Sequence, residues 1–369
     1  MPQSIHDTIN KLNKLTKPFA KLIAVALYST AQGLQDAYVC QTIWGFLSNK
    51  NQHEQTAPVA VAAITSLAAV PLAITIVSGS NTNEQHRVNE HEHGTCHKVC
   101  HKISDLVVVG APFGLLAFSG SLVFLENTQN YSEKLKYSIS AFLGIVAAVG
   151  NAELHGRNIH AEVGYLALLT RIPQNKRCLA VYLSGFIFIS HLFQGFFAGH
   201  SFFDSTDIHN KTAEIIFPSI IGILVTIFEG NTEMRSSLLN MLNDKTHSWA
   251  SKIVTTLASF THGVLPATGL LQMIKLIYEQ STKQELADHI PLWGRILVCM
   301  ALIPVWESNA RGFYNTTINA MDETVTTIGK SLKSTWPFCN FFSSEHESLL
   351  EDNPVNIGRS VSMRYDAIV

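Results

Sequence analysis

Charged residues are scarce in this chain. Asp, Glu, Lys and Arg make up 15% of its 369 residues, whereas soluble domains carry about 25%. Hydrophobic residues, 47% of the total, are concentrated in long runs with polar stretches between them. A helix needs roughly 20 apolar residues to cross the hydrocarbon core of a bilayer. We therefore predict an all-α polytopic membrane protein whose main partner is the lipid bilayer. The alternative is a helical protein that buries every apolar run.

Other features are absent, and each absence narrows the function. The net charge is −2 without a basic patch, so no nucleic-acid partner is expected. The six cysteines are scattered, and Cys40 and Cys299 lie in apolar runs, which argues against a disulfide framework. No Ser-His-Asp order, glycine-rich phosphate loop or HExxH motif occurs, so we predict that the chain is not an enzyme. The first twenty residues are polar and contain lysines, unlike a cleavable signal peptide.

A polar signature recurs at the end of four apolar runs. It reads VSGSN, AVGNAE, IFEGNTE and VWESNAR, with the asparagine at Asn81, Asn151, Asn231 and Asn309. The copies lie about 70 to 80 residues apart, which indicates a duplicated structural unit. Each unit contains two apolar runs and is therefore predicted to be a helical hairpin. We predict about eight transmembrane helices in four hairpins, at about 22–81, 104–152, 178–232 and 252–312.

A weaker twofold pattern overlies the fourfold one. Gln32-Gly33 in the first hairpin resembles Gln194-Gly195 in the third. Each half then holds four helices, so the repeats are parallel, an arrangement found in transporters with substrate sites at the repeat interface.

Lysine and arginine gather on one side of the predicted membrane domain, which spans 22–312. They are frequent in the amino-terminal segment 1–21, between the hairpins and in the tail 313–369, and rarer within the hairpins. The positive-inside rule therefore predicts that both termini are cytosolic. The sequons at Asn130 and Asn210 fall on the opposite side.

The connection between the first two hairpins, residues 86–102, is rich in histidine and cysteine; we call it the His/Cys segment. Imidazole and thiolate are ligands of zinc, copper and ferrous iron. If the segment is helical, residues four apart share a face. The spacing does not match a closed structural zinc motif, and the alternative is a solvated loop that binds metal weakly. The candidate metal ligands are His91, His93, Cys96, His97, Cys100 and His101.

Charged and amide residues accompany the asparagine signatures. The second helix of most hairpins has only about 12 to 16 apolar residues before the signature, so it carries polar groups into the membrane zone or is shielded. Such groups coordinate cations and line ion pathways. In the alternative interpretation the helices simply end there, at the headgroups. The candidate pathway residues are Asn151, Glu153, Glu229, Asn231, Glu233, Glu307 and Asn309.

The first helices of the hairpins also hold polar residues. They are Gln32, Asp36, His191, Gln194, His200 and His262. Hydrogen bonding between helices is the ordinary role of such residues in membrane proteins. We predict that His191 and His262 are inner ligands of the pathway.

The tail carries two short sorting motifs. Glu345 with Leu349 and Leu350 fits the acidic dileucine pattern, and Tyr365 with Ile368 fits the tyrosine-based pattern. Adaptor proteins read both from cytosolic tails and direct cargo to endosomes and lysosomes. They predict sorting adaptors as partners and an endosomal, lysosomal or vacuolar membrane, and they say nothing about activity.

The same acidic stretch, Glu345 to Asp352, resembles the carboxy-terminal signal of type IV secretion effectors such as those of Legionella. That resemblance covers only the tail. It implies an effector of an intracellular bacterium that acts on a host organelle.

Together these features favour a transporter of a divalent metal ion, with zinc, iron or manganese as the candidates. The metal, a zinc or iron ion, is the only cofactor expected. A non-transporting membrane effector or scaffold is the alternative, and a cation channel with pseudo-fourfold symmetry is a third hypothesis.

Overall fold

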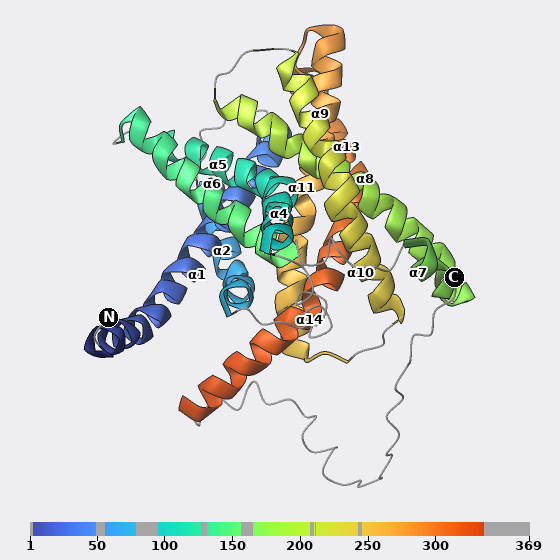
Figure 1. The fold of residues 1–369 in the computed structure, drawn as a ribbon. Coiled ribbons are helices and arrows are strands. Elements are labelled where there is room, and N and C mark those ends of the chain that lie inside the picture. The colour runs from blue at the N-terminus through green and yellow to red at the C-terminus, as the bar shows by residue number, and fades with distance from the viewer. Residues whose placement is uncertain are drawn as a thin grey trace. The chain divides into compact units, whose positions relative to one another are not determined.

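The computed structural model describes residues 3–48, 56–78, 95–126, 131–155, 165–206, 210, 212–242 and 246–335. Nearly all of these residues are helical and none of them forms a strand, which confirms the predicted all-α class (Figure 1). The chain divides into one unit, Met1–Thr326, and a second, Thr327–Val369. In the second unit only the end of the last helix is described.

The helices keep the order of the apolar runs. They are α1 (Gln3–Ser48), α2 (Thr56–Ser78), α4 (Thr95–Asp105), η1 (Leu106–Gly110), α5 (Ala111–Glu126), α6 (Glu133–His155), α7 (Tyr165–Arg171), α8 (Gln174–Ser205), α9 (Ala213–Val225), η3 (Thr226–Gly230), α10 (Asn231–Leu242), α11 (Trp249–Thr282), α12 (Leu286–His289), α13 (Leu292–Ala301) and α14 (Ile303–Thr335). The two η elements are π-helices that join their α-helical neighbours without a break.

Five helical segments in the described part of the chain are long and apolar enough to cross a membrane. They are Val59–Val77, Lys102–Glu126, Glu133–Leu154, Gln174–Ser205 and Ala213–Leu242. Large apolar side chains project outward from them: Leu67 is 72% exposed and Ile145 is 63% exposed. Exposed apolar surface of this kind suits lipid rather than water. These segments support a membrane protein, whereas the count of about eight crossings stays a prediction.

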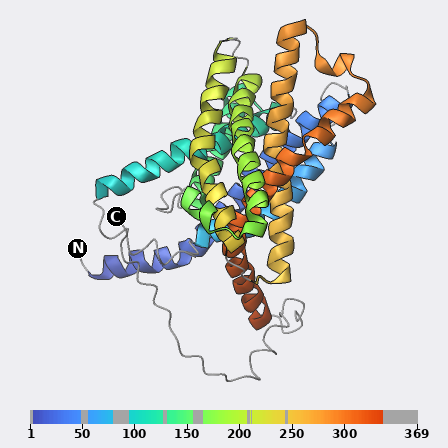
Figure 2. The same cartoon turned by 90° about the vertical axis from the view of Figure 1, so that its right-hand side faces the viewer.

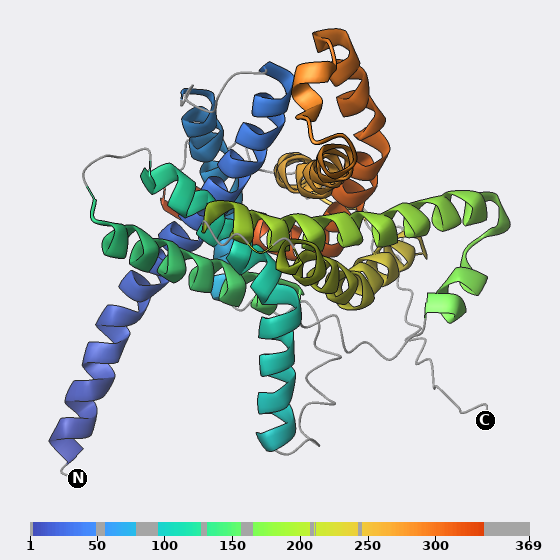
Figure 3. The ribbon, with the colours of Figure 1, turned by 90° about the horizontal axis from the view of Figure 1, so that it is seen from above.

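Consecutive long helices pack against each other. α1 lies along α2, α5 along α6, and α8 along α9, and α8 also packs on α11 (Figures 1, 2 and 3). α14 contacts α11 as well, because the Trp306 indole of α14 donates to the Phe260 carbonyl of α11 at 2.9 Å.

Glycine allows several of these helices to approach closely. A methyl group added at Gly195 of α8 would lie 2.8 Å from the Gly222 Cα of α9, and one at Gly269 of α11 would meet the Phe193 carbonyl of α8. Small residues let backbones approach in this way in membrane helix packing. The face of α8 is therefore fixed against two neighbours.

Three of the four asparagine signatures lie inside helices. α6 continues to His155 beyond Asn151, α10 continues to Leu242 beyond Asn231, and α14 runs through Asn309 to Thr335. The interpretation that these signatures mark helix ends is therefore wrong for all three. Asn81 lies outside the described residues. The predicted boundary between membrane domain and tail, 312/313, falls within α14.

Candidate functional site

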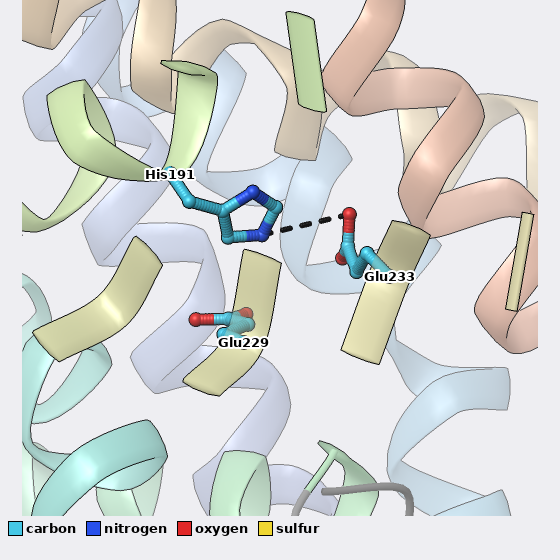
Figure 4. Close-up of side chains that lie close together, drawn as sticks. All are labelled: His191, Glu229 and Glu233. Carbon is cyan, nitrogen blue, oxygen red and sulfur yellow. Dashed lines mark ion pairs between the residues drawn. The ribbon is translucent and has the colours of Figure 1, made fainter. Parts of the chain in front are cut away.

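Three buried side chains from two hairpin helices meet in one cluster. His191 on α8, Glu229 on η3 and Glu233 on α10 are each 0% exposed. Each offers one ligand atom, and these atoms all lie within 4.8 Å of one another. The His191 ring and the Glu233 carboxylate point toward each other, with Nε2 and Oε2 3.6 Å apart (Figure 4). We call these residues the His/Glu/Glu cluster.

A π-helix lies at this cluster. η3 contains Glu229, and α10 begins at the residue after Gly230. A π turn holds more residues than an α turn, so it changes the direction in which the following side chains point. Both glutamates face α8 as a result, and single-turn π-helices occur often at functional sites.

Two glycines make room for the cluster. A Cβ added at Gly230 would lie 3.3 Å from the His191 Cβ. A Cβ added at Gly312, on α14, would meet the Glu233 carboxylate. Gly312 also lies against Ile187 of α8, so α14 covers the cluster where α8 and α10 meet, and a side chain there would displace the Glu233 carboxylate.

The tautomer of His191 follows from its hydrogen bond. Nδ1 lies 2.7 Å from the Ile187 carbonyl oxygen. A carbonyl only accepts, so Nδ1 carries the proton, and in the neutral ring Nε2 presents a lone pair toward Glu233. Metal-ligating histidines are held in this way by a second hydrogen bond.

The cluster lacks compensation for its charge. Among the described residues, neither carboxylate oxygen of Glu229 or Glu233 has a hydrogen-bond partner, and neither has Nε2 of His191. No lysine or arginine of the described part of the chain forms an ion pair with them either. Burying ionised carboxylates without partners costs several kcal/mol each, roughly. The cluster therefore requires added protons or a cation.

A divalent cation fits this donor set. Two carboxylates offset its two charges, and the imidazole lone pair supplies a nitrogen ligand. Zinc, manganese and ferrous iron take such mixed nitrogen and oxygen ligands. Three protein ligands also leave a coordination position open for water or for an exchanging group.

The other predicted pathway residues separate into two groups. Asn309 is fully buried close by: its Nδ2 donates to the His262 carbonyl at 3.4 Å, and its Oδ1 accepts from the Ser190 hydroxyl at 3.4 Å. Asn231 is only partly buried. Glu153 is partly exposed and lies 3.9 Å from the exposed Lys102, and Glu307 pairs with Arg311 one turn on. These two glutamates are placed at the surface, not in the cluster.

His262 and Asn151 lie elsewhere. The His262 ring stacks on Phe113 and Phe313, with centroid distances of 5.5 and 4.2 Å. The Asn151 amide oxygen accepts from the Tyr28 hydroxyl at 3.3 Å. Both residues line a separate cavity beside α1. His191 thus joins the two glutamates, whereas His262, its predicted partner, does not.

Two members of the site were not assigned to it from sequence. Gln194 lies beside Glu229, and Gln194 is fully buried with neither amide atom hydrogen-bonded in the described part of the chain. Its spacing of three from His191, which places both on one helix face, was the available signal. Gly312 gave no signal, because its role depends on contact between distant helices.

The His/Cys segment is helical from Thr95 onward, where α4 begins. α4 continues into the second candidate span. Cys96 and Cys100 therefore stand one turn apart on the helix, as do His97 and His101. The Cys100 side chain is exposed. Outside the described residues lie His91, His93 and the sorting residues Glu345, Leu349, Leu350, Tyr365 and Ile368.

The fold and the site define a helical membrane protein with a buried cluster of metal-ligand type. Comparisons with protein-family models, with curated proteins and with solved structures find no match to this chain.

Proposed function

We propose that the chain is an integral membrane transporter of a divalent metal ion, with zinc, iron or manganese as its substrate. The His/Glu/Glu cluster carries this proposal. It places two carboxylates and an imidazole lone pair, all fully buried, within two segments that are long and apolar enough to span a membrane. Ionisable groups in such segments are costly and typically mark ion pathways.

The number of protein ligands in the cluster supports a transported metal ion rather than a structural one. Structural zinc sites are closed by four protein ligands, whereas this cluster supplies three from protein side chains. An open position lets a metal enter and leave by ligand exchange. Gln194 stands beside Glu229 as a neutral oxygen donor for a metal in transit.

The finer topology belongs to the same proposal. Three pairs of packed consecutive helices and the hydrogen bond between α14 and α11 support four hairpins and about eight crossings. The lysine and arginine distribution supports a cytosolic location for both termini. The His/Cys segment then captures metal on the cytosolic side, and the tail motifs direct the protein to an endosomal, lysosomal or vacuolar membrane through sorting adaptors.

The test is metal content and metal uptake in liposomes that contain the purified protein. Glu229→Gln removes one ligand charge, and Glu307→Gln is its matched control because both residues stand two positions before a signature asparagine. We expect bound metal and flux in the parent protein and in Glu307→Gln, and loss of both in Glu229→Gln. Unchanged flux in Glu229→Gln would remove the cluster from the pathway.

Two other outcomes select the alternative functions. Stoichiometric metal without flux indicates a metal-stabilised effector or scaffold. Flux that does not saturate with metal concentration indicates a channel. Replacing Cys96, His97, Cys100 and His101 by alanine separates capture from transport, because uptake then needs several-fold more metal while the cluster still binds it.

A further inference from the structure

A second polar cavity lies apart from the His/Glu/Glu cluster, between α1, α2, α6, α11 and α14. Its polar lining includes Tyr28, Gln32 and Asp36 from α1, Asn151 from α6 and His262 from α11. Thr65 of α2 and Thr261 of α11 add hydroxyl groups. The rest of the lining is apolar, and among the polar groups oxygen atoms predominate, with one carboxylate.

The amide and phenol groups of this cavity form a directed chain of hydrogen bonds. Gln32 Nε2 donates to the Tyr28 hydroxyl at 3.1 Å, which donates to Asn151 Oδ1 at 3.3 Å. Asn151 Nδ2 in turn donates to the Ala147 carbonyl at 2.9 Å. The chain uses the Tyr28 hydroxyl hydrogen and one of the two amide hydrogens of Gln32 and of Asn151. Their oxygens keep lone pairs, and Gln32 Oε1 accepts no hydrogen bond from the described residues.

Asp36 is the one charged residue in the lining. Within the described part of the chain, no hydrogen bond or opposite charge acts on its carboxylate. The titratable groups around it are Tyr28 and Cys40 on α1 and His262 on α11. The residues that α2, α6 and α14 contribute, including Thr65, Asn151 and Phe313, do not titrate. A single negative charge therefore stands among neutral oxygen groups.

We propose that this cavity binds one monovalent cation at Asp36, either a sodium ion or a proton. The Asp36 cavity has one carboxylate, which suits a monovalent ion. The His/Glu/Glu cluster has two carboxylates and an imidazole, which suit a divalent ion. Sodium is a hard cation that oxygen ligands hold, and a proton neutralises the same carboxylate; either species supplies one positive charge.

The two sites are connected through Asn309. Its amide donates to the backbone carbonyl of His262, which lines the Asp36 cavity, and it accepts from Ser190, the residue before His191. If the proposed function holds, the monovalent cation is the coupling ion of metal transport. That coupling role rests on the proposed function, whereas the cation site itself does not.

The test uses the full chain in detergent, without added divalent metal. Tm is measured against sodium chloride, with choline chloride as the matched salt, at about pH 6 and about pH 8. The variants are Asp36→Asn, Tyr28→Phe and, as a surface control, Glu307→Gln. Asp36→Asn resembles the protonated state, so it is expected to fold.

For sodium, we expect Tm of the parent protein to rise by several degrees at about pH 8, and about tenfold more sodium to be needed in Tyr28→Phe. For a proton, Tm rises on acidification without a sodium response, and Tyr28→Phe behaves like the parent. In the sodium case Asp36→Asn loses the response. In the proton case it shows a smaller rise than the parent, because the buried glutamates of the His/Glu/Glu cluster also take up protons; Glu307→Gln keeps the full response in both cases. An equal response in the parent and Asp36→Asn, or no response in the parent, overturns the proposal. A response that depends on Asp36 in a protein without metal flux upholds the cation site and removes only its coupling role.

Discussion

Two helical segments of this chain carry the same sequence pattern, a glutamate two residues before an asparagine. One segment buries the glutamate, and the other buries the asparagine. In η3 and α10, Glu229 is 0% exposed and Asn231 is partly exposed. In α14, Asn309 is 0% exposed and Glu307 lies at the surface against Arg311. The buried glutamate joins the His/Glu/Glu cluster, whereas the buried asparagine hydrogen-bonds to both α8 and α11.

The helix type separates the two cases. η3 is a π-helix that ends one residue before Asn231, whereas α14 is α-helical throughout its signature. An α-helix turns by about 100° per residue, so the extra residue of a π turn redirects all side chains that follow it. In the regular helix α6 the glutamate follows the asparagine by two residues, as Glu233 follows Asn231, yet Asn151 is buried and Glu153 is partly exposed. A repeated sequence pattern thus does not imply a repeated role.

The glutamates give the largest expected difference between the two helices. Glu229→Gln should weaken metal binding at least about 100-fold, because it removes a ligand charge. The same change should raise the free energy of unfolding of the metal-free protein by about 1 to 3 kcal/mol, because it removes an unpaired buried charge. Glu307→Gln should change neither by a comparable amount. Isothermal titration with metal and chemical unfolding check this, and equal effects of the two substitutions would contradict it.

For the asparagines, the larger effect on the free energy of unfolding should come from α14, not from α10. Asn309→Ala removes a fully buried amide and both of its interhelical hydrogen bonds, so we expect it to lower the free energy of unfolding by about 2 kcal/mol. Asn231→Ala changes a partly exposed side chain and should cost less than about 0.5 kcal/mol. Unfolding of both variants in the same detergent gives the comparison. A costlier Asn231→Ala would contradict the assigned orientations.

A smaller effect is expected where α14 meets the cluster. A methyl group at Gly312 would press on the Glu233 carboxylate, so Gly312→Ala should weaken metal binding by about tenfold through displacement of a ligand. Gly185→Ala on α8 is the matched control, because a Cβ there meets nothing within 4 Å. Metal titration of both variants checks this. Equal affinity in Gly312→Ala and the parent would show that α14 does not confine Glu233.

The smallest effect concerns the distal part of α14, which anchors the start of α11. Asp322 accepts from the Ser248 backbone N–H at 3.1 Å and from its hydroxyl at 2.9 Å, and His247 lies 3.7 Å away. Burial raises the pKa of the Asp322 carboxyl, but hydrogen bonds from Ser251 and Ser248 and the nearby His247 outweigh it, so the pKa lies below its ordinary value.

A carboxyl with a lowered pKa stabilises the fold above its unfolded pKa and loses that contribution as the pH falls through its folded pKa. Asp322→Asn should therefore cost about 1 kcal/mol at neutral pH and progressively less below about pH 4. Unfolding of parent and variant across that range measures the difference. A cost that does not change with pH would show that the charge of Asp322 does not matter.

Some of this structure was predictable and some was not. Apolar runs predict the helices, because their length and composition are local properties. His191, Glu229 and Glu233 could also be identified as candidate site residues, because ionisable residues in apolar runs are unusual. Their separation from Glu153, Glu307 and His262 was not, since it depends on the direction each side chain takes around its helix. The π-helix and Gly312 determine that direction at the cluster, and neither has a local sequence signature.

The glycine contacts of α8 have a kinetic consequence. Gly195 against Gly222 and Gly269 against Phe193 leave no free space between the backbones of α8, α9 and α11. His191 and Glu233 are fully buried, so on the proposed function a metal bound between them leaves only when whole helices separate. Side-chain rotations take nanoseconds, whereas collective helix movements take microseconds to milliseconds. On the proposed function, turnover is therefore limited by the movement of whole helices, and it should respond strongly to membrane thickness and temperature.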